Sequence, residues 1–137
     1  MLNNDYIRVV VANEDTGRFT TGIVRPNPND FVELFESTDL DGKYMQIGKY
    51  EYFVIFDVKR QKAQYPITAM TKIRGIFNRR YKTTLRGSFV IAKTNDAGRP
   101  VTLSDDEINN VMKHLILISD TQRTNTFPVV EVAGAVD

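Results

Sequence analysis

The sequence predicts an α+β fold, with an antiparallel β-sheet followed by a C-terminal α-helix, in a single domain over residues 1–137. Three observations predict it. Short runs rich in β-branched and aromatic residues recur along the first two thirds of the chain, as in strands. Gly, Pro, Asn and Asp separate these runs at short intervals. Only one later stretch repeats its apolar residues at helical spacing, and 137 residues suffice for one buried core.

The first expected element is an N-terminal hairpin. Tyr6–Ala12 has a β-branched centre, Asn13–Gly17 supplies turn residues, and Arg18–Val24 resumes a strand-like composition. Arg25–Asp30 contains two prolines, which lack a ladder donor, so this segment is expected to leave the sheet. Two short strands and the loop between them are expected next, at Phe31–Phe35, Lys43–Ile47 and Glu36–Gly42.

Three longer strands are expected at Tyr50–Arg60, Gln64–Arg74 and Tyr81–Lys93, with a loop at Gly75–Arg80. Strand side chains alternate between two faces. If the three strands pair as a meander, one face is apolar and the other carries basic and hydroxyl groups. The apolar face would hold Tyr52, Val54, Phe56, Val58, Tyr65, Ile67, Ala69, Ile73, Leu85, Phe89 and Ile91. Pro66 is expected near the start of its strand, where proline is tolerated.

The helix is expected from Ser104 to about Ser119, after a loop at Thr94–Val101. Ser104 and Glu107 have the spacing of a capping box, and the carboxylates of this first turn suit the positive end of the helix dipole. An apolar stripe follows at Ile108, Val111, Met112, Leu115 and Ile118. The tail Phe127–Asp137 contains Pro128 and Gly134 and is expected to be extended.

This inventory predicts self-association. A helix of roughly 16 residues is only about 24 Å long, which is too short to cover the apolar face of six or seven strands. An antiparallel sheet tolerates water on one face, but not on so apolar a face. We therefore expect an obligate homodimer, in which the partner supplies the missing cover.

The charge of the chain is segregated. The 137 residues include 18 Lys or Arg and 17 Asp or Glu, but the segment from Lys59 to Lys93 holds ten basic residues and no acidic one. Residues 1–58 hold five basic and ten acidic residues, and residues 94–137 hold three and seven. Such a local positive field is typical of proteins that bind polyanions. The alternative is a solvated face that acidic neighbours balance in the fold.

The sequence argues against an enzyme. It has no cysteine and one histidine, His114, so thiolate chemistry is excluded and a metal site or another cofactor is not expected. His114 has no carboxylate at a catalytic spacing and is expected at a surface or an interface. Asp39–Gly42 resembles the start of a calcium loop without its later ligands, and is expected to be a turn. No membrane span or export signal is expected.

Aromatic residues of the basic block (Tyr65, Phe77, Tyr81 and Phe89) suit base stacking in general. Strand alternation places Tyr65, Tyr81 and Phe89 on the core side of the sheet. It assigns no side to Phe77, which lies in the expected loop.

The order of these elements resembles the coat proteins of single-stranded RNA bacteriophages. The resemblance rests on the hairpin, the long strands that end in Arg86-Gly-Ser-Phe-Val-Ile, and the Ser104-Asp-Asp-Glu opening of the helix. It implies a capsid protein whose dimers extend the sheet, exchange helix cover and assemble into an icosahedral virion in the cytoplasm of a bacterial host. It also implies binding of genomic RNA, including a hairpin that represses replicase translation. The family commonly has a second short helix, whereas the tail here reads as extended.

Carried onto this chain, the resemblance places RNA on the basic face of the sheet and places the Gly75–Arg80 loop at symmetry axes. The implied RNA-binding residues are Lys59, Gln64, Thr68, Lys72, Arg74, Lys82, Thr84, Arg86 and Ser88. Asp57 would fall on the same face. Two alternatives stay open: a β-rich single-strand nucleic-acid-binding protein of OB type that forms no particle, and a phage structural adaptor that needs no basic face.

Overall fold

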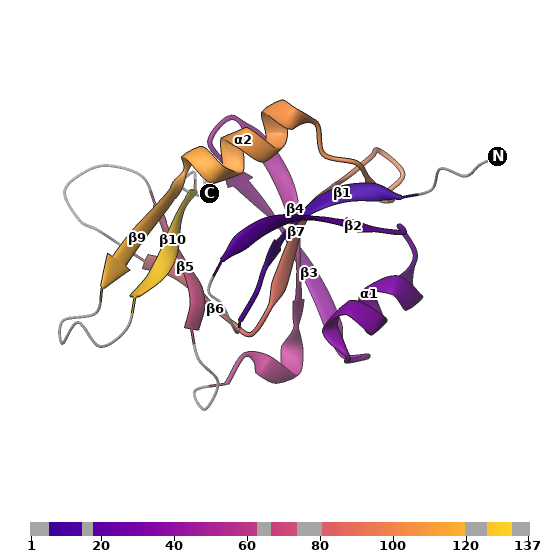
Figure 1. The fold of residues 1–137 in the computed structure, drawn as a ribbon, viewed down its shortest axis with the longest axis horizontal. Coiled ribbons are helices and arrows are strands. Elements are labelled where there is room, and N and C mark those ends of the chain that lie inside the picture. The colour runs from indigo at the N-terminus through magenta and orange to yellow at the C-terminus, as the bar shows by residue number, and fades with distance from the viewer. Residues whose placement is uncertain (1–5, 15–17, 63–66, 74–80, 120–125, 133–137) are drawn as a thin grey trace.

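The computed structural model describes residues 6–14, 18–62, 67–73, 81–119 and 126–132. It is an α+β fold with a mainly antiparallel sheet and two helices (Figure 1). The elements are β1 (Ile7–Ala12), β2 (Phe19–Val24), α1 (Pro28–Phe35), β3 (Leu40–Ile47), β4 (Tyr50–Asp57), the short 3-10 helix η1 (Val58–Arg60), β5 (Ile67–Ile73), β6 (Tyr81–Arg86), β7 (Phe89–Thr94), β8 (Pro100–Val101), α2 (Asp105–Lys113), β9 (Leu115–Ser119) and β10 (Thr126–Val132).

The described strands lie in the order β2-β1-β7-β4-β3-β10-β5-β6, with β8 beside β7 and β9 beside β10. The N-terminal hairpin is confirmed, since β1 and β2 pair antiparallel from Ile7 opposite Val24 to Ala12 opposite Phe19. The strand at Lys43–Ile47 is also confirmed, although β3 begins at Leu40 and thereby shortens the expected Glu36–Gly42 loop. The parallel pair β5–β10 is the exception to antiparallel pairing.

The expected meander of the three long strands is wrong. β4 pairs with β3 and β7, and the two strands β3 and β10 lie between β4 and β5. The third expected strand is interrupted at Gly87, whose φ of 73° is accessible to glycine at little cost. A Cβ at this position would lie 2.7 Å from the Cβ of Arg60. The break lets β6 pair with β5 while β7 joins the central sheet.

The expectation of a strand at Phe31–Phe35 is wrong, because these residues belong to helix α1. Asn27 caps the helix by accepting a hydrogen bond from the Asp30 amide, 3.0 Å away. Pro28 occupies the first turn, where its missing N–H costs nothing and its fixed φ suits a helix. Asp30 also lies in that turn, near the positive end of the helix dipole. Capping chemistry therefore overrides the strand-like composition of the segment.

The central strands β1, β7 and β4 are buried on both faces. The row Val10–Ile91–Val54 packs in the cluster that includes α2, and the neighbouring row contributes Val90 and Ile55 to the cluster that includes α1. The face opposite Tyr52 is therefore apolar rather than polar. Helix α1 thus supplies part of the cover from within the chain, and the obligate dimer stays a prediction.

Helix α2 ends earlier than expected, at Lys113, and Leu115–Ser119 forms strand β9. β9 pairs antiparallel with β10, from Leu115 opposite Val130 to Ser119 opposite Thr126. A short apolar run fits both helical and strand periods, and here the pairing decides in favour of the strand. The extended conformation expected after Phe127 is confirmed as far as Val132.

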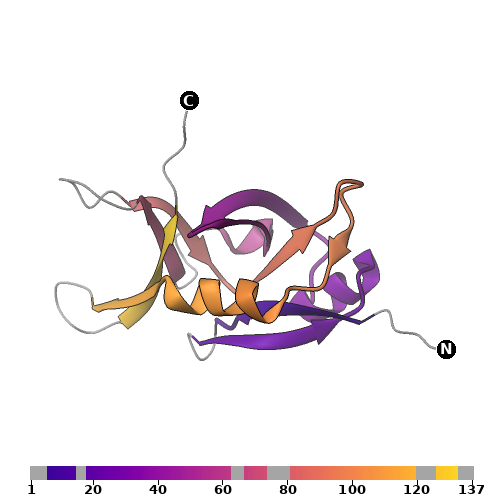
Figure 2. The ribbon, with the colours of Figure 1, turned by 90° about the horizontal axis from the view of Figure 1, so that it is seen from above.

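The two helices α1 and α2 occupy different parts of the molecule. β5, β6, β9 and β10 gather at one end of the molecule and α1 lies at the other, while α2 runs along one side (Figures 1 and 2). The fold thus separates the centre of the basic block from the segment around α1.

The cover supplied by α1 gives a stability prediction. Replacing buried Phe31, 6% exposed, with Ala should lower the free energy of unfolding by about 3–5 kcal/mol, because it leaves a cavity in the α1 cluster. Leu34→Ala on the same helix, at a side chain 43% exposed, should cost about 1 kcal/mol or less. Urea unfolding measures both, and equal losses would contradict the assigned cover.

Candidate functional site

The β5–β6 hairpin, residues 67–73 and 81–86 with the chain between them, holds the centre of the basic block. Residues 67–86 include six Lys or Arg residues and no Asp or Glu. The two strands pair antiparallel, and β6 ends the strand order among the described residues. The hairpin adjoins β10 at one end of the molecule (Figure 2). The fold therefore keeps a concentration of basic residues together on one element.

Regular alternation does not hold along this hairpin. The register shifts between Ile67 and Ala69, and again between Thr71 and Lys72. Lys72 consequently pairs with Tyr81, although alternation assigned these two residues to opposite faces. On its other side Lys72 stands opposite Glu131 of β10. The backbone register thus makes Lys72 and Glu131 cross-strand partners of opposite charge.

The nine predicted RNA-binding residues do not form one sheet face. Lys72, Lys82 and Thr84 lie on the hairpin and are described by their backbone positions, while Gln64 and Arg74 lie outside the described residues. Lys59 is exposed on η1, after β4, and two strands separate β4 from the hairpin. Asp57 is buried and accepts hydrogen bonds from Ser37 and the Lys59 amide. The prediction of a basic face shared by three adjacent strands is therefore wrong.

Three other predicted residues take part in the fold. Thr68 is buried, at 3% exposure, so its assignment to a solvent-facing surface is wrong. The Ser88 hydroxyl accepts the Glu14 amide at 3.0 Å. Arg86 is half-buried, and both its amide and its carbonyl bond the Gln61 side chain, at 3.0 and 2.6 Å.

Two basic residues of the block pair with acidic ones outside it. The Lys93 ammonium lies 2.9 Å from both carboxylate oxygens of Glu107 on α2. Arg60 lies 3.6 Å from the Glu14 carboxylate. These pairs engage two of the ten basic residues of the block, and six of the other eight lie within residues 67–86.

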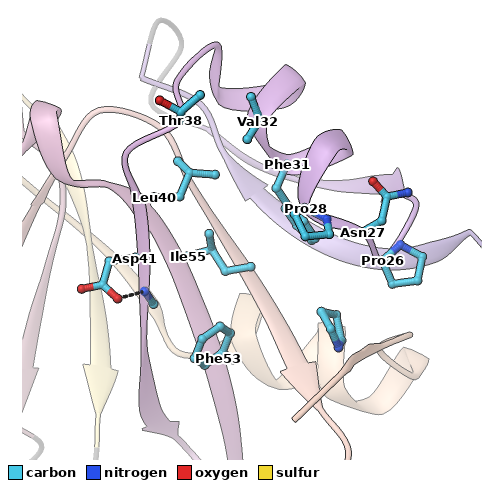
Figure 3. Close-up of a pocket in the computed structure, with 12 residues that line it drawn as sticks. Pro26, Asn27, Pro28, Phe31, Val32, Thr38, Leu40, Asp41, Phe53 and Ile55 are labelled. Carbon is cyan, nitrogen blue, oxygen red and sulfur yellow. Dashed lines mark hydrogen bonds between the residues drawn. The ribbon is translucent and has the colours of Figure 1, made fainter.

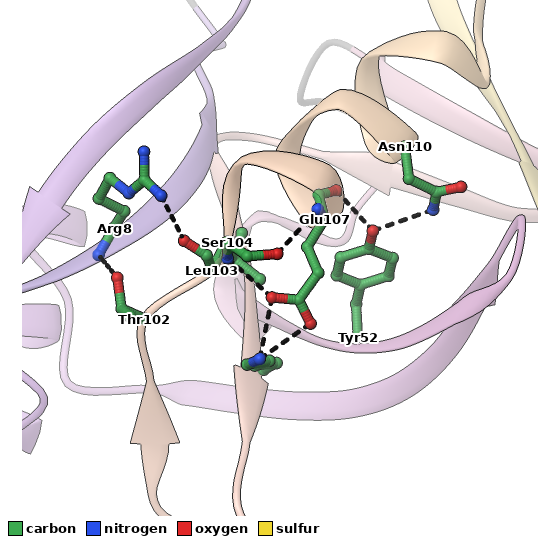
Figure 4. A network of polar contacts seen from close by, with 8 residues as sticks. Arg8, Tyr52, Thr102, Leu103, Ser104, Glu107 and Asn110 are labelled. Carbon is green, nitrogen blue, oxygen red and sulfur yellow. Dashed lines mark hydrogen bonds and ion pairs between the residues drawn. The ribbon is translucent and has the colours of Figure 1, made fainter.

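A polar network fixes α2 on the sheet (Figure 4). The Tyr52 hydroxyl donates to the Glu107 carbonyl at 2.6 Å, and the Asn110 amide donates to Tyr52 and to the Ile47 carbonyl at 2.9 and 2.6 Å. At the end of the helix, the Nδ1 atom of His114 lies 2.7 Å from the Asn110 carbonyl. His114 is half-buried within the chain, and its expected position at a surface or an interface stays a prediction.

The capping box at the start of α2 is confirmed. The Ser104 hydroxyl accepts the Glu107 amide at 3.2 Å, and the Glu107 carboxylate accepts the Ser104 amide at 2.7 Å. Arg8 of β1 fastens the preceding turn, since its guanidinium donates to the Leu103 carbonyl at 3.0 Å (Figure 4). It also pairs with Asp105 at 2.6 Å. The carboxylates of this first turn therefore serve structure.

The titration of this network follows from its contacts. Burial raises the pKa of the Tyr52 hydroxyl to about 12, with the Asn110 hydrogen bond acting in the opposite direction, so Tyr52 stays a donor at neutral pH. Burial also raises the pKa of the Glu107 carboxyl, but hydrogen bonds from Lys93 and Ser104 outweigh it and leave the pKa below its ordinary value. Glu107 is consequently an anion paired with Lys93.

Sequence reasoning missed Asn110, Gln61 and Tyr52 as polar anchors. One signal was present, because Glu107, Asn110 and His114 recur at spacings of three and four residues along one edge of the helix. Gln61 gave no such signal. Its partner is the main chain of Arg86, which is distant in sequence and comes close to Gln61 only in the folded chain.

The described residues contain no group of three or more His, Asp or Glu side chains that is arranged to hold a metal ion. Asp41 in the suspected calcium loop accepts its neighbouring Gly42 amide at 2.8 Å within strand β3, so the expected turn there is wrong. Neither described helix has the length and apolar composition needed to cross a lipid bilayer.

Comparisons of the chain with protein-family models, curated proteins and solved structures give no match. The resemblance to phage coat proteins therefore stays a prediction.

The Glu107–Lys93 pair predicts an acid-sensitive contribution to stability. Because the folded pKa of Glu107 is lowered, the pair stabilises the fold above the unfolded pKa of about 4.3, and this contribution is lost as pH falls through the folded pKa. Glu107→Gln should lower stability at pH 7 by about 1–3 kcal/mol and flatten the acid limb of the stability curve. Asp106→Asn, at an exposed carboxylate of the same turn, should do neither. Thermal unfolding between pH 2 and 7 measures the stability of the wild type and both variants. If the stability of Glu107→Gln changes with pH in parallel with the wild type, the pairing is contradicted.

Proposed function

We propose that this protein is a non-enzymatic shell subunit that binds single-stranded RNA through the β5–β6 hairpin and assembles with copies of itself. The observation that carries the RNA proposal is the acid-free stretch of residues 67–86, with six Lys or Arg residues on one element at an end of the fold. Each phosphate that a basic residue neutralises releases condensed counterions, and this needs no recognition of sequence.

The element suits a long flexible polyanion better than a small ligand. β6 lies last in the strand order, so a strand of RNA can pass along it without entering the core. Leu85 of β6 is 2% exposed and belongs to the hydrophobic core, so it anchors the hairpin to the rest of the fold. Binding at the hairpin therefore leaves the packing of β1, β7 and β4 unchanged.

The shell proposal is carried by the resemblance described above, which gives the protein a place in a virion assembled in a bacterial host. The fold adds one supporting feature. The described sheet begins with β2 and ends with β6, and Ile23 on β2 is 66% exposed. An edge strand with an exposed apolar side chain offers a surface for pairing with another chain. Repression of translation through an RNA hairpin belongs to the same proposal.

Expression of the protein without other viral components tests the shell directly. Electron microscopy of the purified material should show closed particles, and their absorbance should show host RNA inside. RNA-bound dimers that form no particle would favour the OB-type alternative. Oligomers without nucleic acid would favour the structural adaptor, and either result would overturn the proposal.

The hairpin residues should contribute unequally to RNA binding. Lys82→Ala should lower the slope of log affinity against log salt by about 0.7–0.9, the value for one phosphate contact. Lys72→Ala should change it less, because Glu131 stands opposite Lys72, and Glu131→Gln should strengthen binding. Thr84→Val should change the preference among RNA hairpins and leave the salt slope as it is, since a hydroxyl releases no counterions.

Lys113→Ala removes the same charge from the exposed end of α2 and serves as the matched control. RNA titrations at several salt concentrations measure all five variants. If Lys82→Ala and Lys113→Ala have the same slope as the wild type, the basic block is a solvated surface and the RNA proposal fails.

A further inference from the structure

Helix α1 leaves part of the sheet face beneath it uncovered. The eight-residue helix is about 12 Å long, and a groove of about 460 Å³ lies between it and strands β3 and β4 (Figure 3). Phe31 and Val32 form one wall, and Leu40, Phe53 and Ile55 face them from the sheet. Gly42 leaves room for the Phe53 ring, since a Cβ there would fall inside van der Waals contact with it. The groove is therefore apolar and open to solvent.

The groove lies in an acidic surrounding. Most of its lining comes from residues 26–42, a segment with five Asp or Glu residues and no Lys or Arg. Asp41 lines the groove itself. The nearest basic residues in sequence are engaged elsewhere, because Lys43 lies over the Phe56 ring and Arg25 over the Tyr6 ring. An occupant with apolar side chains flanked by positive charge would match both properties.

The chain itself contains such a segment. Between β5 and β6 the sequence reads Arg74-Gly-Ile-Phe-Asn-Arg-Arg80, which is two large apolar residues flanked by three arginines. Lys72 pairs with Tyr81, so only eight residues of sequence connect two adjacent strands. α1 lies at the opposite end of the molecule (Figures 1 and 2). Because the hairpin and the groove lie at opposite ends of one copy, a groove for this segment is sought on another copy.

We propose that the α1–β3–β4 groove of one copy receives the Arg74–Arg80 segment of a second copy. Ile76 and Phe77 would bury apolar surface against Phe31, Val32 and Phe53, while the arginines would face Asp41 and the surrounding carboxylates. This contact is heterologous, because it joins two different surfaces. It can repeat from copy to copy, and it closes into a ring or shell where the rotation between copies allows and extends as a filament where it does not. It rests on the proposed self-assembly and needs no RNA.

A charge swap tests the contact on RNA-free protein in sedimentation at low salt. Asp41→Arg and the double variant Arg79→Glu/Arg80→Glu should each weaken self-association at least roughly tenfold, as expected when a close charge pair becomes repulsive. An equal mixture of the two should restore association, because the reversed charge at position 41 of one variant then meets the reversed charges at positions 79 and 80 of the other. Asp41 is exposed, so its replacement should leave the fold intact.

Two variants of matched charge serve as controls. Glu51→Arg and Lys49→Glu/Lys113→Glu change exposed residues that do not line the groove and should associate like the wild type. Association of the swapped variants at the wild-type level, or a mixture no better than its components, would overturn the proposal.

A peptide separates the apolar part from the charge. A synthetic peptide with the sequence of residues 72–82 should shift the amide NMR signals of Val32, Leu40 and Phe53. The Arg79→Glu/Arg80→Glu protein is used, because the reversed charge of its own segment keeps that segment from competing for the groove. The same peptide with Ser at positions 76 and 77 should bind at least roughly tenfold more weakly. Shifts confined to other regions would overturn the groove as the receptor.

These outcomes are distinguishable from a failure of the proposed function. If Asp41→Arg protein still binds RNA and forms particles, the groove contact is wrong and the shell proposal stands. If wild-type protein neither binds RNA nor associates, the proposed function fails first.

Discussion

The burial of β1, β7 and β4 on both faces is the constraint on which the rest of the structure depends. Once both sides of these strands are apolar, each side needs a helix, and the chain supplies α1 between β1 and β4 and α2 after β7. Polar contacts then fix α2 at defined points, through Tyr52 and Asn110 at its middle and Lys93 at Glu107. The charged surfaces lie outside this arrangement, at the two ends of the molecule.

That separation gives the fold two chemically different ends. The β5–β6 hairpin carries the acid-free stretch, and the segment around α1 carries five acidic residues without a basic one. Charges of one sign repel locally, so each end gains from a partner of opposite sign. RNA and a second copy of the chain are two such partners for the basic end. The proposed RNA binding and the proposed contact between copies thus follow from one distribution of charge.

Local chemistry made the first hairpin and the start of α2 predictable. β-branched residues around Asn13–Gly17 define the hairpin, and Ser104 with Glu107 defines the capping box, because both depend on residues close in sequence. Helix α1 was not predicted, because Phe31 and Phe35 suit a strand by composition and the Asn27 cap decides for a helix. The candidate site failed where it depended on strand order. Nothing near Lys59 or Thr68 in sequence shows that β3 and β10 intervene between β4 and β5.

The central functional claim is that RNA meets the β5–β6 hairpin rather than the central sheet. Ultraviolet cross-linking of purified protein to bound RNA, followed by mass spectrometry of the linked peptides, tests it most directly. The account predicts that the linked peptides fall within residues 67–86. Links concentrated on β1, β7, α1 or α2, with none in that stretch, would contradict it.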